Sequence, residues 1–98
     1  MPTYVHLVNY TSEGVENIIE GRDRLEQIRE AAREAGGDLT DVFLTFGQYD
    51  LVGVSEFPSD EAAAQFALTA SAMGGSDSET LKAFTEDEFG SIVAAINE

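Results

Sequence analysis

The apolar residues of the chain follow two spacings, one typical of strands and the other of helices. Three stretches rich in β-branched and aromatic residues, and a fourth around Leu81, predict strands. Three further stretches have apolar side chains every three or four residues and predict helices. Along the chain the order is strand 3–10, helix 12–35, strand 39–46, strand 49–57, helix 60–73, strand 78–84 and helix 86–96.

This β-α-β-β-α-β order with an appended C-terminal helix predicts an α+β fold of ferredoxin-like type. In such a fold two helices cover one face of an antiparallel four-stranded sheet. Capping residues precede the predicted helices: Thr11 or Ser12, Ser59 or Asp60, and Thr85. Gly21 interrupts the first helix, so we expect a kink or break near residues 20–22.

The first predicted strand is apolar on both faces, because side chains alternate between the two faces of a sheet. Val5 and Leu7 point one way, and the others point the opposite way: Tyr4, His6, Val8 and Tyr10. A face open to water would be more polar than either of these. We therefore expect the second face to be buried against another copy of the chain, with His6, Val8 and Phe43 in that interface.

The composition excludes several kinds of chemistry and several kinds of binding partner. Ninety-eight residues predict a single domain, 1–98, and the absence of cysteine excludes disulfides and thiolate chemistry. Nineteen acidic residues against five basic ones give a net charge of −14, so nucleic acid and anionic membranes are not expected partners. With no signal-like or membrane-spanning stretch, we expect a cytoplasmic protein. The acidity with a single lysine favours a salt-adapted, halophilic cytoplasm.

The tetrapeptide Gly47-Gln48-Tyr49-Asp50 lies between the second and third predicted strands. Glycine permits the positive φ of a tight turn, and the aspartate places a carboxylate beside it. With its flanking stretches this motif resembles the GYD-domain family over nearly the whole chain. The matching stretches are 7–11, 35–38, 46–52, 57–63 and 78–84. The resemblance implies a fold related to dimeric α/β-barrel proteins and brings no established activity.

Five side chains are candidate ligand-binding residues: His6, Tyr4, Phe43, Tyr49 and Asp50. His6, the only histidine, either lines a pocket beside Tyr4 and Phe43 or is a hydrogen-bonded interface residue. Asp50 either fixes the turn or, with Tyr49, orients a polar ligand at the mouth of a cleft. No spaced pair of ligands on one element suggests a metal site, and we expect no cofactor.

Four arginines of the first helix could bind an anion: Arg22, Arg24, Arg29 and Arg33. The acidic residues between them favour instead a solvated helix face with i,i+4 ion pairs.

Three functional interpretations follow. The first is a small-molecule-binding or regulatory module that works as a homodimer or larger homo-oligomer. The second, implied by related dimeric α/β barrels, is an enzyme of the cofactor-independent monooxygenase or isomerase type. The third is a purely structural subunit. A polar pocket with a perturbed His6 would favour the first two, and a closed apolar space between sheets would favour the third.

Overall fold

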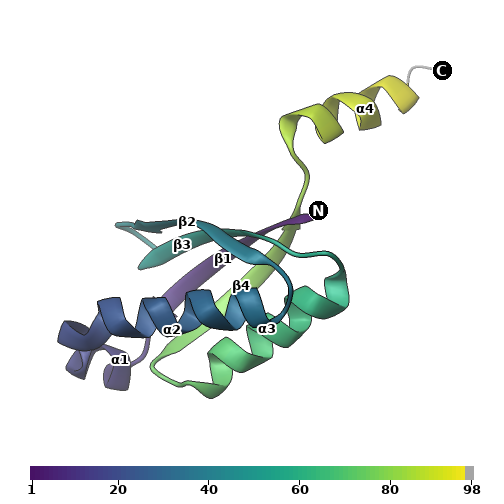
Figure 1. The fold of residues 1–98 in the computed structure, drawn as a ribbon. Coiled ribbons are helices and arrows are strands. Elements are labelled where there is room, and N and C mark those ends of the chain that lie inside the picture. The colour runs from purple at the N-terminus through teal and green to yellow at the C-terminus, as the bar shows by residue number, and fades with distance from the viewer. Residues whose placement is uncertain (97–98) are drawn as a thin grey trace.

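A four-stranded antiparallel sheet with helices on one face forms the body of the protein in the computed structural model, which describes residues 1–96 (Figure 1). The strands are β1 (Thr3–Tyr10), β2 (Asp38–Leu44), β3 (Leu51–Glu56) and β4 (Ser76–Ala83), in the spatial order β2-β3-β1-β4. The helices are α1 (Ser12–Glu16), the 3₁₀ helix η1 (Ile18–Glu20), α2 (Gly21–Glu34), α3 (Asp60–Ala72) and α4 (Glu86–Ile96). The predicted α+β fold with ferredoxin-like βαββαβα order is confirmed.

Three helices begin at capping residues that were predicted from the sequence. The Thr11 hydroxyl accepts from the backbone N–H of Gly14 at 3.3 Å, and the Ser59 hydroxyl caps α3 in the same way. Thr85 and Glu88 bond reciprocally to each other's backbone N–H groups and form a capping box at the start of α4. The break predicted near residues 20–22 is confirmed but begins earlier, because α1 already ends at Glu16.

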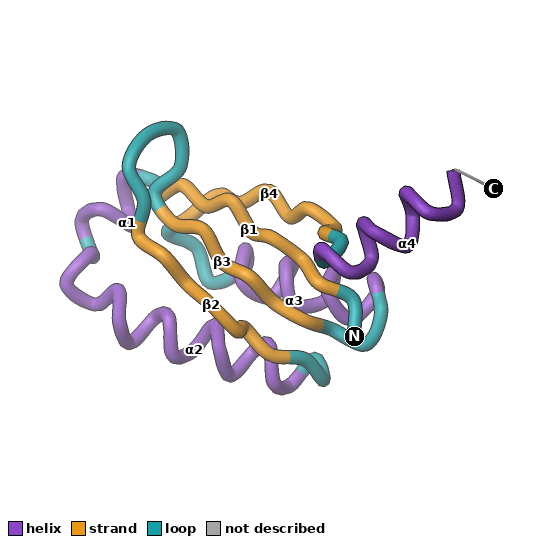
Figure 2. The backbone as a smooth tube through the Cα atoms, turned by 90° about the horizontal axis from the view of Figure 1, so that it is seen from above, coloured by secondary structure: helices purple, strands orange, loops and turns teal. Residues whose placement is uncertain are grey.

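The two faces of the sheet are assigned differently from the prediction. Helices α2 and α3 lie behind the strands in Figure 2 and cover the face that carries Tyr4 and His6. Both side chains are buried, whereas Phe43 lies on the opposite face and is 57% exposed. The expectation that His6 and Val8 share the uncovered face with Phe43 is therefore wrong. Both faces of β1 are apolar, so alternation alone does not reveal which face the helices cover.

Aromatic side chains close one end of the space between the sheet and the helices. The ring of Phe57 lies 6.1 Å from that of Tyr4 and 5.1 Å from that of Phe66. Buried alanines on the two helices, Ala32 on α2 and Ala63 on α3, allow the backbones to approach this cluster closely. The core is therefore densest around these rings.

Helix α4 stands apart from the rest of the fold. It continues from the end of β4 and projects to the side of the sheet opposite α2 and α3 (Figure 1). Its apolar side chains are exposed, and none of its described residues is buried. These exposed residues are Phe89, Ile92, Val93 and Ile96. The helix is thus amphipathic but has no partner within the described part of the chain.

Candidate functional site

A cavity of about 400 Å³ lies between the helix-covered face of the sheet and helices α2 and α3. The sheet contributes His6, Val8 and Val42 to its walls, and the helices contribute Leu25, Ile28 and Ala67. Its walls are predominantly apolar, and its volume falls in the range of small-molecule sites. Among the lining residues, Ile18 and Leu44 are 45% and 79% exposed, so the cavity opens at the end of the fold that holds η1 and the turn after β2.

Small side chains create this space. Gly53 of β3 lies opposite His6 of β1 and presents no side chain to the cavity. On α3, Ala67 and Ala70 contribute only methyl groups where the cluster around Phe66 ends. The aromatic rings therefore fill one end of the layer between the sheet and the helices, and the other end stays hollow.

His6 forms the deep part of the cavity wall. Its Nε2 lies 2.6 Å from the Ser55 hydroxyl and its Nδ1 lies 3.0 Å from the Thr80 hydroxyl. The ring also packs edge-on against Phe66, with centroids 5.4 Å apart. Burial lowers the pKa of His6, which favours the neutral imidazole. Both ring nitrogens are hydrogen-bonded, so the observed arrangement is that of a positioned wall residue.

The other sheet candidates lie outside the cavity. Tyr4 sits at the closed end, where its hydroxyl donates to Asp60 Oδ1 at 2.5 Å and Lys82 contacts the same carboxylate at 3.1 Å. The hydrogen bond to Asp60, together with burial, raises the pKa of Tyr4 to about 12. This contact ties the first turn of α3 to β1. The expected grouping of Tyr4, His6 and Phe43 around one pocket is wrong, because only His6 lines the cavity.

The Gly-Gln-Tyr-Asp turn is held by several hydrogen bonds. Asp50 accepts from the backbone N–H of Tyr10 through Oδ2 at 2.9 Å, and its own N–H donates to the Val8 carbonyl at 2.8 Å. The Thr45 hydroxyl donates to the Tyr49 carbonyl at 2.6 Å, and Gly47 has a φ of +104°. Asp50 and Tyr49 do not line the cavity. Asp50 does fix the ends of β1 and β3, which the turn-fixing interpretation requires.

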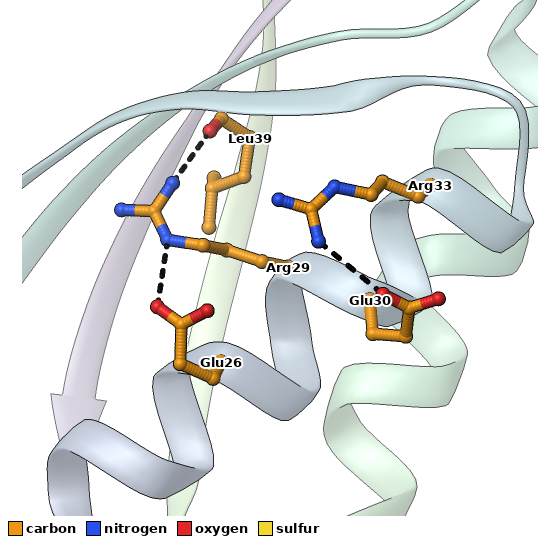
Figure 3. A network of polar contacts seen from close by, with 5 residues as sticks. All are labelled: Glu26, Arg29, Glu30, Arg33 and Leu39. Atoms are coloured by element: carbon orange, nitrogen blue, oxygen red, sulfur yellow. Dashed lines mark hydrogen bonds and ion pairs between the residues drawn. The ribbon is translucent and has the colours of Figure 1, made fainter.

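Two of the four arginines on α2 have acidic partners on the same helix (Figure 3). Arg29 lies 3.5 Å from Glu26 and donates to the Leu39 carbonyl at 2.9 Å, while Arg33 lies 3.2 Å from Glu30. These pairs are spaced i,i+3, so the predicted i,i+4 spacing is wrong. Arg33, whose side chain is 56% exposed, agrees with the solvated-face interpretation, whereas the Arg29 side chain is 27% exposed and reaches β2.

Arg22 and Arg24 instead line the cavity. The Arg24 guanidinium packs against Gly75, where an added Cβ would lie 1.7 Å from Nη1. Gly75 has a φ of +84°, a backbone conformation that favours glycine, whereas the guanidinium contact alone could be relieved by movement of the flexible Arg24 side chain. From the sequence, both arginines were possible anion binders, but a solvated helix face was favoured for all four. The available signal for separating these two was their position directly after the helix break at Gly21, before the Glu-Arg pairs that follow.

Within residues 1–96, no group of three or more His, Asp or Glu side chains could hold a metal ion. No helix in this part of the chain has the length and apolar character that crossing a bilayer needs.

A ferredoxin-like α+β fold with an apolar cavity between sheet and helices is the class that these features define. Residues 4–93 match the GYD domain, so the chain belongs to the GYD-domain family, and the resemblance inferred from the sequence is confirmed. The fold is similar to that of TTHA0845 from Thermus thermophilus, with a TM-score of 0.57 and 23% identity over 87% of this chain and 95% of that chain. This likeness shows the fold alone. No curated protein matches the chain.

Proposed function

We propose that this GYD-domain protein binds a small, largely apolar molecule in the cavity between its sheet and its helices. The cavity itself is the observation that supports the proposal. Protein interiors are normally close-packed, and residual cavity volume lowers stability. A chain of 98 residues that places Gly53, Ala67 and Ala70 around about 400 Å³ of space forgoes packing that larger side chains would supply. Ligand binding explains why that space stays open.

The arrangement of His6 favours binding over proton transfer. Both of its ring nitrogens are engaged by hydroxyl groups, and burial lowers its pKa. A general base needs a lone pair within reach of the substrate. This observation ranks the binding module above the monooxygenase or isomerase alternative.

Filling the cavity tests the proposal. The neutral fluorophore N-phenyl-1-naphthylamine should bind one-to-one with enhanced emission, and Ala67→Phe, which fills the cavity from α3, should weaken binding at least about tenfold. Ala64→Phe is the matched control, because Ala64 lies on the exposed side of the same helix. Circular dichroism must show that both variants are folded. Equal binding by the wild type and a folded Ala67→Phe variant would place the probe elsewhere and refute the cavity as the site.

We further propose that the protein is a homodimer of the α/β-barrel type, with the uncovered sheet faces of two copies packed together. That face is apolar at its centre, where Val5 lies between Val54 and Leu81 and Leu7 lies beside Val52. On this face Leu81 and Phe43 are 41% and 57% exposed in the single chain, and a contiguous exposed apolar patch often marks an interaction site. Two-fold symmetry would bury the same patch on both copies.

Helix α4 supports a second copy as the partner for this face. The helix lies on the same side of the sheet as the uncovered face (Figure 1), and its apolar side chains are exposed. A copy stacked on that face would bring its own body within reach of α4, and the symmetric contact would satisfy both helices. The combined interface should exceed ~1,000 Å², the size that stable complexes need. Sedimentation equilibrium separates such a dimer from the 10.6 kDa monomer.

The setting that we propose is a cytoplasm of high ionic strength. Two copies with a net charge of −14 each repel one another strongly at low salt. Dissolved ions screen this repulsion, which makes both the fold and the dimer dependent on salt.

A further inference from the structure

We infer that the molecule bound in the cavity is a carboxylic acid with an apolar body, whose carboxylate is held at the mouth by Arg24 with the help of Arg22. This inference rests on the proposed binding function and names the chemical class of its ligand.

The distribution of charge around the cavity carries the inference. The chain has 19 acidic and five basic residues, yet among the described residues that line the cavity none is acidic and two are arginines. With this composition, the charged side chains around a cavity placed at random would be mostly carboxylates. The cavity lining is therefore positively charged on a protein that is otherwise strongly negative, and this favours a ligand with an anionic group.

The position of Arg24 suits a hydrogen-bond donor to an anion. Its guanidinium lies beside the backbone of Gly75, another residue of the cavity wall, and carries five N–H donors. Its nearest acidic partner is Glu13, at 3.8 Å, and that glutamate side chain is 65% exposed. An ion pair at this distance, with one partner largely exposed to solvent, contributes little to stability. A ligand carboxylate can replace it with two parallel, shorter hydrogen bonds.

The deep part of the cavity suits an apolar body. Beyond the arginines the walls are formed by aliphatic and aromatic side chains such as Leu25, Ile28 and Phe66. Apart from Tyr10 and the two arginines, His6 is the only ionisable lining residue, and its lowered pKa favours the neutral ring. A ligand with charge at one end only would place it at the mouth and bury the remainder.

Three probes with the same tail separate this inference from the proposed function. Octanoate, 1-octanol and octylammonium are each used to displace N-phenyl-1-naphthylamine from the wild-type protein. Octanoate should displace the fluorophore at about a tenfold lower concentration than 1-octanol, and octylammonium should be the weakest. The net charge of −14 on its own would produce the reverse order, with the cation strongest.

Arg24→Gln then assigns the preference to one residue. The change should reduce octanoate affinity about tenfold and leave 1-octanol affinity within about twofold. Arg33→Gln is the matched control on the same helix, because Arg33 does not line the cavity and pairs with the exposed Glu30. An octanoate preference that is absent, or that survives both Arg24→Gln and the Arg22→Gln, Arg24→Gln double variant, would overturn the inference while cavity binding stands. Failure of the fluorophore to bind, or its insensitivity to Ala67→Phe, would overturn the proposed function and this inference with it.

Discussion

The carboxylate of Asp50 joins the turn after β2 to the end of β1. Its Oδ2 accepts from the Tyr10 N–H, and its backbone N–H donates to Val8, so one residue holds both sides of the strand end. Asparagine keeps an acceptor oxygen at this place, whereas alanine leaves the Tyr10 N–H without its partner. We expect Asp50→Asn to change the free energy of unfolding little and Asp50→Ala to lower it by about 1 kcal/mol or more.

Thermal melting of the two Asp50 variants checks this expectation. The same samples should bind N-phenyl-1-naphthylamine as the wild type does, because Asp50 does not line the cavity. Unchanged midpoints for both variants, combined with lost binding, would contradict the turn-fixing role and make Asp50 a ligand contact.

His6 predicts how stability depends on pH. Burial lowers its pKa in the folded state, so below the unfolded value of about 6.5 the unfolded chain binds more protons than the folded one. Its contribution is therefore fully present above that pH and is lost as the pH falls toward the folded pKa. The ring's neighbours Ser55, Thr80 and Phe66 carry no charge that would offset this effect.

The free energy of unfolding should thus fall between about pH 7 and about pH 5. His6→Gln should remove most of this slope, whatever its effect on absolute stability, because the chain has no other histidine. Urea titrations of both proteins across this pH range measure the two slopes. Parallel pH profiles for wild type and variant would show that other groups control stability in this range.

At the scale of elements, local chemistry was sufficient to predict the order of strands and helices. The caps at Thr11 and Ser59 and the capping box at Thr85 are encoded within a few residues of each helix start. Strand ends differ by a few residues, as for β3, which was expected at 49–57 and spans Leu51–Glu56. Such ends depend on cross-strand pairing, which short stretches of sequence do not specify.

The candidate site was predictable only in part, because it arises from packing between distant elements. His6 was recognised as the only side chain expected to titrate near neutrality, but its neighbours Ser55 and Thr80 come from two other strands. The cavity results from small residues on β3 and α3 that face each other across the layer. The spacing of apolar residues along the chain does not reveal that a cavity will be left unfilled. It also does not distinguish Arg24, which lines the cavity, from Arg33 on the same helix.

Helix α4 leads to a prediction about assembly. An isolated helix of 11 residues is marginally stable in water, so its apolar side needs a covering surface. If that surface is a second copy, Phe89→Ser should weaken the dimer at least about tenfold, since Phe89 is 61% exposed in the single chain and would be buried in the interface. Leu68→Ser is the matched control, because Leu68 is 73% exposed on α3, away from the proposed interface.

Sedimentation equilibrium at micromolar concentration and high salt measures both variants. A wild-type protein that sediments at 10.6 kDa, or a Phe89→Ser variant that dimerises as well as the wild type, would contradict the role assigned to α4.

For the whole molecule, the net charge of −14 acts on three levels at once. Self-repulsion opposes the compact state, repulsion between copies opposes the dimer, and the general field repels the anionic ligand inferred above. A favourable contact can outweigh this repulsion where it acts at short distance and is partly shielded from the other charges, as at Arg24 beside Gly75. Salt should favour the fold and the dimer, since both are opposed by charges spread over the surface.

Thermal stability should therefore rise with ionic strength. The screening length falls from ~30 Å at 0.01 M salt to ~3 Å at 1 M salt, which is shorter than most distances between charges on separate elements. At a fixed protein concentration, the melting midpoint in potassium chloride should increase clearly across this range. The double variant Glu16→Lys, Glu34→Lys, at two exposed acids, makes the net charge less negative and should show a smaller increase. Any effect of salt on apolar contacts would be equal in the two proteins. A midpoint that is flat with salt, or an increase that is unchanged in the double variant, would show that the acidity of this surface is not an adaptation to salt.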